Sequence, residues 1–424
     1  MRRYWGEIKD PIYGYIYITK AEKELIDSFP VQRLHRLRQL AGAEYVYPAA
    51  NHTRFEHSLG VMYLAGLACE NSNLTDHLAK DEMQIVRFAA LLHDVGHGPF
   101  SHIYEQLLEK IGKTHEDLTQ WIIEKSELKD ILQKIGQNPT PVAKLAVGKL
   151  DLHKKNFIDQ IIQSAVDVDK LDFIVRDTYH TGAKYGYVDV FRLIHAFDVL
   201  EGNLAINLGA LSVLESLILA RIESFKSIYF HRVGRAAQIM LAMAMENAKD
   251  ELGLTDFETP EEYLALNDYT VWAMLKTCEK SREIIENLER RRLLKCAYEK
   301  TFQVRDTALS RMLEDEEIRN KIRDKIAEKA KVPTKAVIID VPTVPSVPYH
   351  HSILMKPMEI PVFNKTRKGE KIPQKLGEIS GIVNVLEGFL NILRVYTQEK
   401  NRTKVSTAAT GILGETPFSA KISY

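Results

Sequence analysis

Apolar residues recur at every third or fourth position through most of the chain between residues 20 and 330. This spacing places apolar side chains on one face of a helix. It is found in six stretches, at residues 59–69, 82–92, 117–125, 157–179, 211–249 and 261–299. The pattern predicts a mostly α-helical core that covers residues 1–330.

Two other segments depart from the helical pattern. Aromatic and β-branched residues alternate at 10–18 around a proline and a glycine, which predicts a short N-terminal hairpin. Proline and β-branched residues become frequent at 331–342 and indicate short strands and turns, whereas an apolar stripe at 376–396 predicts another helix. We therefore expect a smaller C-terminal α/β lobe over residues 331–400 and a mobile tail over residues 401–424.

The overall charge of the chain argues against a large charged binding surface. Its 424 residues include 57 Lys and Arg and 57 Asp and Glu, so the formal net charge is zero. Any site for an anion must therefore be local, and nothing global indicates binding to nucleic acid or to an anionic membrane. A net charge near zero also removes one barrier to self-association, which favours a homo-oligomer such as a dimer or tetramer.

The cysteines and the apolar runs indicate in which cellular compartment the protein resides. Cys69, Cys278 and Cys296 are widely spaced and odd in number, which fits neither a disulfide framework nor a zinc knuckle. The chain has no signal-type segment and no apolar run of about eighteen residues, the length that a membrane span requires. We therefore expect a soluble cytoplasmic protein that does not bind membranes.

A His-Asp pair at the end of one predicted helix is the first sign of a metal site. His93 and Asp94 follow the apolar run at residues 89–92, so two ionisable side chains would be taken out of water. A bound cation would compensate that cost. For the pair alone, a hydrogen-bonded core histidine beside a helix-terminal aspartate explains the sequence at least as well.

His57 and Asp169 strengthen the case for a metal. His57 leads another predicted helix, and Asp169 lies in a third, where carboxylates recur among apolar residues. A solvated acidic face is the commoner origin of such carboxylates, but the remaining positions of this segment are mostly apolar. With His93 and Asp94, these residues offer imidazole and carboxylate ligands to a divalent ion of borderline hardness, as in hydrolytic metal centres.

Three further histidines could supply acid–base groups beside this centre. Hydrolysis by a metal-polarised water needs a protonated group near the leaving atom. His97 and His102 flank Gly98-Pro99, which ends the helix and could turn both rings toward one cavity. His115 stands at a helix start with a capping-box pattern. Taken alone, each histidine could also be an ordinary surface or capping residue.

The spacing of His57, His93-Asp94 and Asp169 resembles that of the HD superfamily of metal-dependent phosphohydrolases. Longer motifs narrow the resemblance. The segments RFEHSLGV, HDVGHGPFSH and DVDKLD, at residues 54–61, 93–102 and 167–172, resemble the deoxynucleoside triphosphate triphosphohydrolases of the SAM-and-HD-domain type. The match runs from about residue 8 to about residue 240. It implies an HD-type helical core.

The resemblance also implies an activity and cofactors. A deoxynucleoside triphosphate would be hydrolysed at the α-phosphorus to a deoxynucleoside and inorganic triphosphate. A divalent transition metal (Zn, Fe, Mn or Ni) would occupy the His/Asp site, and Mg²⁺ would accompany the triphosphate. The family's residues around the α-phosphate correspond here to His97, His102, Glu105, His115 and Glu116. We expect His115 to donate the proton and Glu105, where the family more often has Asp, to orient it.

Family positions that bind the substrate correspond to Gln39, Arg54, Lys170, Phe173, Asp177, Arg221 and Tyr229. The three basic residues match phosphate contacts, although an ordinary salt bridge would also explain either arginine alone. Gln39 and Asp177 match the pair that hydrogen-bonds the sugar 3′-hydroxyl. Phe173 or Tyr229 would pack against the sugar, with Phe173 in place of the usual tyrosine.

Regulation by a bound nucleotide is the least determined feature. Relatives that a nucleotide activates hold a guanine between subunits with Asp, Gln and Arg. Asp27 and Gln32 match two of these residues, but His35 replaces the arginine, and Arg232 is available for phosphate. An activating nucleotide therefore remains one alternative, and its absence or a different selectivity is the other.

Two other functions compete with a dNTP triphosphohydrolase. The same metal could hydrolyse a phosphodiester or phosphomonoester of another nucleotide. Alternatively, the chain could bind nucleic acid with a vestigial HD site. The zero net charge and the complete set of four ligands count against this last alternative, and binding to nucleic acid remains undetermined.

Overall fold

The computed structural model describes residues 4–153, 155–304, 315–342, 361–386 and 389–415. Helices dominate up to residue 289, as predicted, and most of the buried apolar side chains there form one hydrophobic core. These helices are α1 (Lys20–Ile26), α2 (Phe29–Arg33), α3 (Arg54–Glu70), α4 (Ser72–Thr75), α5 (Lys80–Leu92), α6 (His102–Lys110), α7 (His115–Lys125), α8 (Glu127–Lys134), α9 (Pro139–Ala146), α10 (Asn156–Ile162), α11 (Val168–Thr181), α12 (Val190–His195), α13 (Leu211–Ser224), α14 (Arg232–Leu252), α15 (Pro260–Ala265), α16 (Asp268–Thr277) and α17 (Glu279–Glu289).

The predicted helices at 59–69, 82–92 and 117–125 are confirmed as α3, α5 and α7. The three longer predictions are each divided, and the helical part of 261–299 becomes α15, α16 and α17. The segment 157–179 becomes α10 and α11, because Asp167 caps α11 by accepting a hydrogen bond from the backbone N–H of Lys170. The segment 211–249 becomes α13 and α14, separated by a π-helical turn at Phe225–Tyr229.

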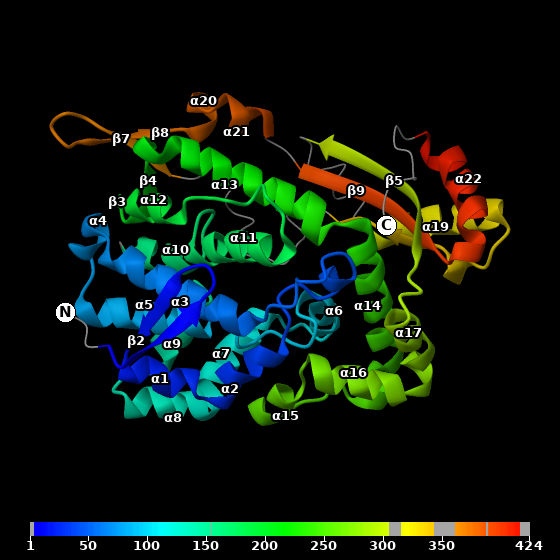
Figure 1. The fold of residues 1–424 in the computed structure, drawn as a ribbon, viewed down its shortest axis with the longest axis horizontal. Helices are drawn as coiled ribbons and strands as arrows, with labels where there is room; N and C mark the ends of the chain where they lie inside the picture. The colour runs from blue at the N-terminus through cyan, green and yellow to red at the C-terminus, as the bar shows by residue number, and fades with distance from the viewer. Residues whose placement is uncertain (1–3, 154, 305–314, 343–360, 387–388, 416–424) are drawn as a thin grey trace.

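The predicted N-terminal hairpin is confirmed. Strands β1 (Gly6–Asp10) and β2 (Gly14–Ile18) pair antiparallel, with Asp10 opposite Gly14 at the turn. Ile16 and Ile18 are buried, whereas Tyr15 and Tyr17 are exposed, which is the alternation expected of a two-stranded sheet with one packed face. The hairpin packs against α3 (Figure 1), the helix that carries His57.

Two small sheets complete the fold. One has the order β3 (Phe197–Leu200), β4 (Asn203–Asn207), β7 (Val362–Lys365) and β8 (Lys371–Gln374). The other has the order β5 (Lys295–Val304), β9 (Phe389–Thr397) and β6 (Ile338–Asp340). Figure 1 shows β5 and β9 beside α19 (Glu316–Ala330) and α22 (Arg402–Leu413), at the opposite end of the molecule from the hairpin.

These sheets correct three expectations about the C-terminal part. The lobe does not begin at residue 331, because β5 pairs with β9 and α19 packs in the same small hydrophobic cluster. The helical prediction fails at 290–299, because α17 ends at Glu289 and β5 begins at Lys295, and it fails at 389–396, where β9 forms. Within residues 376–386 the chain forms two short helices, α20 (Leu376–Ile379) and α21 (Gly381–Leu386), and residues 387–388 lie outside the described part of the chain.

The predicted mobile tail at 401–424 is also corrected in part. Residues 402–413 form helix α22, which buries Val405, Ala408 and Ala409 against the lobe. Small apolar residues at helical spacing therefore hold this segment in place. Residues 416–424 lie outside the described part of the chain. Among the helices that the structure describes, none has the length and apolar character needed to cross a membrane.

Candidate metal centre

Three helices bring the four predicted ligands together. His57 lies in the first turn of α3, which a capping box between Thr53 and Glu56 starts. His93 caps the C-terminal end of α5 and Asp94 follows it. Asp169 stands in the first turn of α11. Because α3 packs against both α5 and α11, the ends of these helices meet at one point.

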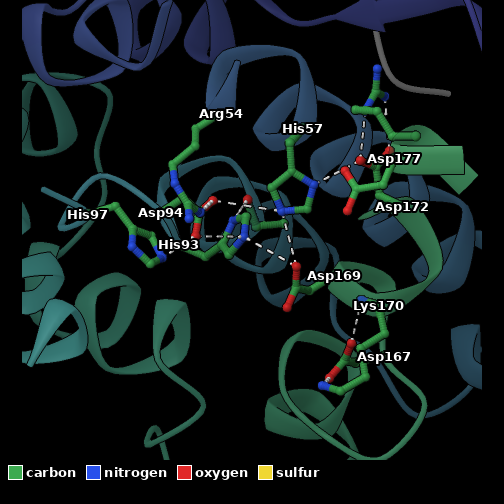
Figure 2. A network of polar contacts seen from close by, with 12 residues as sticks. Arg54, His57, His93, Asp94, His97, Asp167, Asp169, Lys170, Asp172 and Asp177 are labelled. Atoms are coloured by element: carbon green, nitrogen blue, oxygen red, sulfur yellow. Dashed lines mark hydrogen bonds and ion pairs between the residues drawn. The ribbon is translucent and has the colours of Figure 1, made fainter. Parts of the chain in front are cut away.

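The four side chains face one another closely. The Nε2 atom of His57 lies 3.0 Å from Asp169 Oδ1 and 3.7 Å from Asp94 Oδ2. The Nε2 atom of His93 lies 3.3 Å from Asp94 Oδ1 and 3.7 Å from Asp169 Oδ1. Figure 2 shows both imidazoles and both carboxylates directed at the same small space. Ligand atoms of His57, His93 and Asp94 all lie within 4.8 Å of one another.

The hydrogen bonds of the two histidines fit metal binding. The Nδ1–H of His57 donates to Asp172 Oδ2 at 2.8 Å, and that of His93 donates to the carbonyl oxygen of Ala90 at 2.8 Å. Both Nε2 atoms are thereby left to face the cluster, and the buried Nε2 of His93 has no hydrogen-bond partner. Metal-binding histidines are commonly oriented in this way by a carboxylate or carbonyl at the second nitrogen. The residues present therefore fit a divalent ion.

The charges in the cluster favour a cation. Burial raises the pKa of the Asp94 carboxyl, but Arg54 and His93 hold that pKa well below its usual range. Burial raises the pKa of Asp169, but the neighbouring imidazoles of His57 and His93 outweigh that effect and lower this pKa below its usual range. Burial lowers the pKa of His57, but its contacts with Asp169 and Asp172 raise it to about 10. A proton on His57 or a bound cation would balance these carboxylates.

One pocket joins the cluster to most of the predicted phosphate-site residues. It is lined by Arg54, His57, His93, Asp94, His97, His102, His115, Glu116, Ala146, Val147, Ile162, Gln163, Asp169 and Lys170. Arg54 Nη1 donates to Asp94 Oδ2 at 2.5 Å. Lys170 Nζ donates to Asp167 Oδ2 at 2.6 Å. Both cations are almost fully buried, so their positions are set by these carboxylates.

The three pocket histidines differ in their preferred charge. Burial lowers the pKa of His97 well below its usual value, with a further contribution from Arg54. Burial also lowers the pKa of His102, to about 4. Burial lowers the pKa of His115 too, but Glu105, whose Oε1 accepts a hydrogen bond from Nδ1 of His115, raises it above the ordinary value. Of these three rings, His115 is the one whose surroundings raise the pKa and so favour the protonated form.

The remaining predicted substrate residues gather around His52. Its Nε2 lies 2.8 Å from Asp177 Oδ1, and its carbonyl oxygen accepts the backbone N–H of Gln39 at 3.0 Å. Tyr229 donates its hydroxyl hydrogen to Asp177 Oδ2 at 2.5 Å, and the Phe173 ring lies 6.3 Å from that of Tyr229. Gln39, Asp177 and Phe173 are buried, and Tyr229 is partly buried beside Asp177 and Phe173. Arg221 lies on α13 with its guanidinium 5.8 Å from the Phe225 ring.

The residues proposed for nucleotide regulation make local contacts. Asp27 pairs with Lys23 on the surface, and Gln32 donates to the carbonyl oxygen of Ile26 at 2.9 Å. His35, in place of the expected arginine, stacks on Phe55 at 3.7 Å. The first residue of α14, Arg232, accepts the Tyr396 hydroxyl hydrogen at its carbonyl oxygen. These contacts leave the regulatory roles as predictions.

Sequence reasoning missed three residues of the site. His52 bonds to Asp177 across 125 residues, Asp172 orients His57 and Arg176 donates to Asp172. The recurrence of aspartates on α11 was a signal for Asp172. No local sequence pattern marks His52 or Arg176 as a residue of the site.

Comparisons with known proteins agree with this geometry. Residues 54–175 match the model of the HD domain, and residues 188–419 match that of the HD associated region. A hypothetical protein from Aquifex aeolicus, known from its crystal structure, is 29% identical with a TM-score of 0.77, and the alignment covers 95% of this chain and 99% of that one.

Two curated relatives match over 68% of this chain. An uncharacterized protein of Methanocaldococcus jannaschii is 33% identical over 294 residues, and the chain covers 58% of its length. The deoxynucleoside triphosphate triphosphohydrolase SAMHD1 homolog of Dictyostelium discoideum is 32% identical over 308 residues, and 59% of its length is covered. The chain thus spans somewhat more than half of each relative. The His/Asp cluster on α3, α5 and α11 and the two matched models together establish that this chain belongs to the HD-domain family of metal-dependent phosphohydrolases.

Proposed function

We propose that the protein is a metal-dependent dNTP triphosphohydrolase, which cleaves its substrate at the α-phosphorus. The observation that carries this proposal is the pocket in which two buried cations, Arg54 and Lys170, line the same space as the metal ligands and His115. A triphosphate needs several fixed positive charges, and a metal with two such cations supplies them. The name of the Dictyostelium relative supports the same substrate class.

We assign separate roles in hydrolysis to the metal ligands, His115 and Glu105. His57, His93, Asp94 and Asp169 would hold a divalent transition metal such as Zn, Fe, Mn or Ni, and the chemistry supplied there would be activation of a water for attack on phosphorus. The new bond joins the water oxygen to the α-phosphorus, and the bond from that phosphorus to the sugar 5′-oxygen breaks. His115 gives a proton to the 5′-oxygen. Because Glu105 accepts a hydrogen bond from Nδ1 of His115, Nε2 is the nitrogen that would donate the proton.

Residues of this pocket and of the group around His52 would bind and orient the substrate. Arg54, Lys170 and Arg221 would contact the phosphates, with Mg²⁺ accompanying them. His97, His102 and Glu116 would line the α-phosphate. We assign Gln39 and Asp177 to the 3′-hydroxyl, and Phe173 with Tyr229 to the face of the sugar. A homo-oligomer, with an activating nucleotide near Asp27, Gln32 and Arg232, belongs to the same proposal.

Product analysis tests this assignment. The purified chain, loaded with Mn²⁺ and supplied with Mg²⁺, would be incubated with the four dNTPs and the four NTPs, and products separated by anion exchange. We expect deoxynucleoside and inorganic triphosphate in equal amounts. Release of orthophosphate alone would contradict the proposal and favour a phosphomonoesterase.

Substitutions in the pocket separate a triphosphatase from other hydrolases of the same metal. The double variant Arg54→Gln with Lys170→Gln should abolish release of triphosphate, whereas hydrolysis of p-nitrophenyl phosphate should change far less. His195→Asn, an exposed histidine on α12, serves as the control with unchanged rates. Equal loss on both substrates would argue for a different role of the two cations.

A further inference from the structure

A continuous series of buried polar contacts connects the metal ligand His57 to the N-terminal hairpin. His57 Nδ1–H donates to Asp172 Oδ2 at 2.8 Å. Arg176 donates to both oxygens of Asp172, at 2.8 and 2.9 Å, and through Nη1 to Asp10 Oδ2 at 2.9 Å. Figure 2 shows the first of these contacts, with His57 between Asp169 and Asp172. Every side chain in the series is at most 4% exposed.

The two carboxylate oxygens of Asp10 accept hydrogen bonds from different parts of the protein. Oδ1 accepts the backbone N–H groups of Ile12 and Tyr13, at 2.8 and 2.9 Å, and so forms the turn between β1 and β2. Oδ2 accepts from Arg176. One carboxylate therefore fixes the hairpin turn and the guanidinium that holds Asp172. The ring of Tyr13, which follows in the same turn, lies 5.7 Å from that guanidinium.

The helix that carries His57 is shaped to admit this ion pair. Gly60 lies one turn after His57 on α3, and a Cβ at this position would come within 1.9 Å of Asp172 Oδ1 and 2.5 Å of Arg176 Nη2. Any larger residue would displace the pair from α3. The close approach of Asp172 to His57 thus depends on a glycine that lacks a side chain.

The charges explain why the hairpin should matter to the metal. Arg176 is shared between two buried carboxylates, Asp10 and Asp172. A carboxylate that accepts from the second nitrogen of a ligating histidine orients the ring and raises its basicity. Without Asp10, the whole guanidinium charge would fall on Asp172, which would then accept less strongly from His57.

We propose that Asp10, Arg176 and Asp172 are positioning residues that make the metal affinity of the centre depend on the docking of the β1–β2 hairpin. The inference requires a metal at His57 and does not depend on the substrate proposed above. Coupling between two sites is reciprocal. Undocking of the hairpin turn should weaken metal binding by some factor. A bound metal must therefore shift the docking equilibrium of the turn toward the docked state by the same factor.

The variant Asp10→Asn isolates the link. Its amide oxygen can still accept the two turn N–H groups, whereas its amide nitrogen presents a donor to Arg176. Titration of the metal-free full chain with Mn²⁺ should show a Kd raised about tenfold, and Asp172→Asn should raise it by about 10- to 100-fold.

The control is another buried carboxylate–arginine pair. Glu22 caps α1 through the backbone N–H of Thr19 at 2.7 Å and accepts from Arg87 Nε at 2.6 Å. This pair is as buried as that of Asp10 with Arg176, and Arg87 also donates to the carbonyl oxygen of Tyr17 on β2 at 3.2 Å, so the control pair touches the same hairpin away from the Asp10 turn. Glu22→Gln should lower stability while leaving the Mn²⁺ Kd within about twofold of wild type. Equal weakening of Mn²⁺ binding by both variants would overturn the proposal.

Hydrogen exchange tests the reciprocal effect in the unaltered protein. Saturation with Mn²⁺ should slow amide exchange at Ile12 and Tyr13 by about the tenfold factor expected from Asp10→Asn. The amide of Thr19, which bonds to Glu22, should not change. In Asp10→Asn the protection of the turn by Mn²⁺ should vanish. If Mn²⁺ protects α3 and α11 in the wild type but leaves both turn amides unaffected, the proposal is wrong.

Discussion

Lys170 Nζ lies 2.6 Å from Asp167 Oδ2, so the cation proposed for the phosphates is held by the residue that caps its own helix. The same Oδ2 accepts the backbone N–H of Ser164 at 2.7 Å, and Oδ1 accepts that of Lys170 at 2.8 Å. Both side chains are buried. The start of α11 and the position of this positive charge are therefore inseparable.

Replacement of Asp167 by Asn should weaken substrate binding more than it weakens the fold. The amide oxygen can still cap α11, but the amide nitrogen cannot hold the ammonium group. Loss of this charged hydrogen bond should raise KM for a dNTP about tenfold. Steady-state kinetics would be compared with Asp189→Asn, another aspartate cap, at the start of α12. A lower Tm with unchanged KM would show that Asp167 is only a cap.

Replacement of Glu105 by Gln should move the pH profile of hydrolysis. Glu105 raises the pKa of His115, and we propose that His115 acts in its protonated form, so activity should be lost as pH rises through that pKa. In Glu105→Gln the pKa of His115 falls, and the loss should begin at lower pH. The variant Glu109→Gln, an exposed residue of the same helix α6, should keep the wild-type profile. An alkaline limb unmoved by Glu105→Gln would exclude His115 as the acid.

The metal ligands were predictable because each lies in a short continuous sequence motif. The apolar period of α3, α5 and α11 placed His57, His93 and Asp169 on helices, and the HD motifs named the four residues that the structure brings together. The adjacent His93-Asp94 pair is a short-range signal of the same kind.

The long-range parts were not predictable from the sequence. Asp10 and Arg176 are separated by 166 residues, and a lone aspartate or arginine is usually a surface residue. The apolar residues of β5 and β9 fit a strand or a helix, and the antiparallel pairing of the two segments decides for strands. Both the Asp10–Arg176 contact and the strands β5 and β9 depend on a partner that lies far away in the sequence. A short stretch of sequence does not contain that partner.

Metal removal should destabilise the protein. A ligand that binds only the folded state adds about 2.7 kcal/mol at a concentration of 100 Kd. Dialysis against EDTA should therefore lower Tm, and Mn²⁺ should restore it, as followed by differential scanning calorimetry. His93→Ala should remove the response to Mn²⁺, whereas His195→Ala should retain it. A Tm that does not respond to EDTA in a preparation shown to be metal-free afterwards would contradict binding at this cluster.

Asp177 should determine recognition of the sugar 3′-hydroxyl. It is 1% exposed and is held by His52 at 2.8 Å and by Tyr229 at 2.5 Å, so its carboxylate has a fixed position. A hydrogen bond from the substrate to such a fixed group contributes about 1.4 kcal/mol or more, which is about tenfold in kcat/KM. The wild type should therefore prefer dTTP to its 3′-deoxy analogue by at least about tenfold.

Asp177→Ala should reduce kcat/KM for dTTP to that for the 3′-deoxy analogue while leaving the value for the analogue nearly unchanged. Tyr229→Phe, which removes one of the two groups that hold the carboxylate, should give an intermediate preference. Both variants leave the metal ligands intact, so Mn²⁺ content should equal that of the wild type. Equal loss on both nucleotides would mean that Asp177 supports the fold of α11 and does not read the sugar.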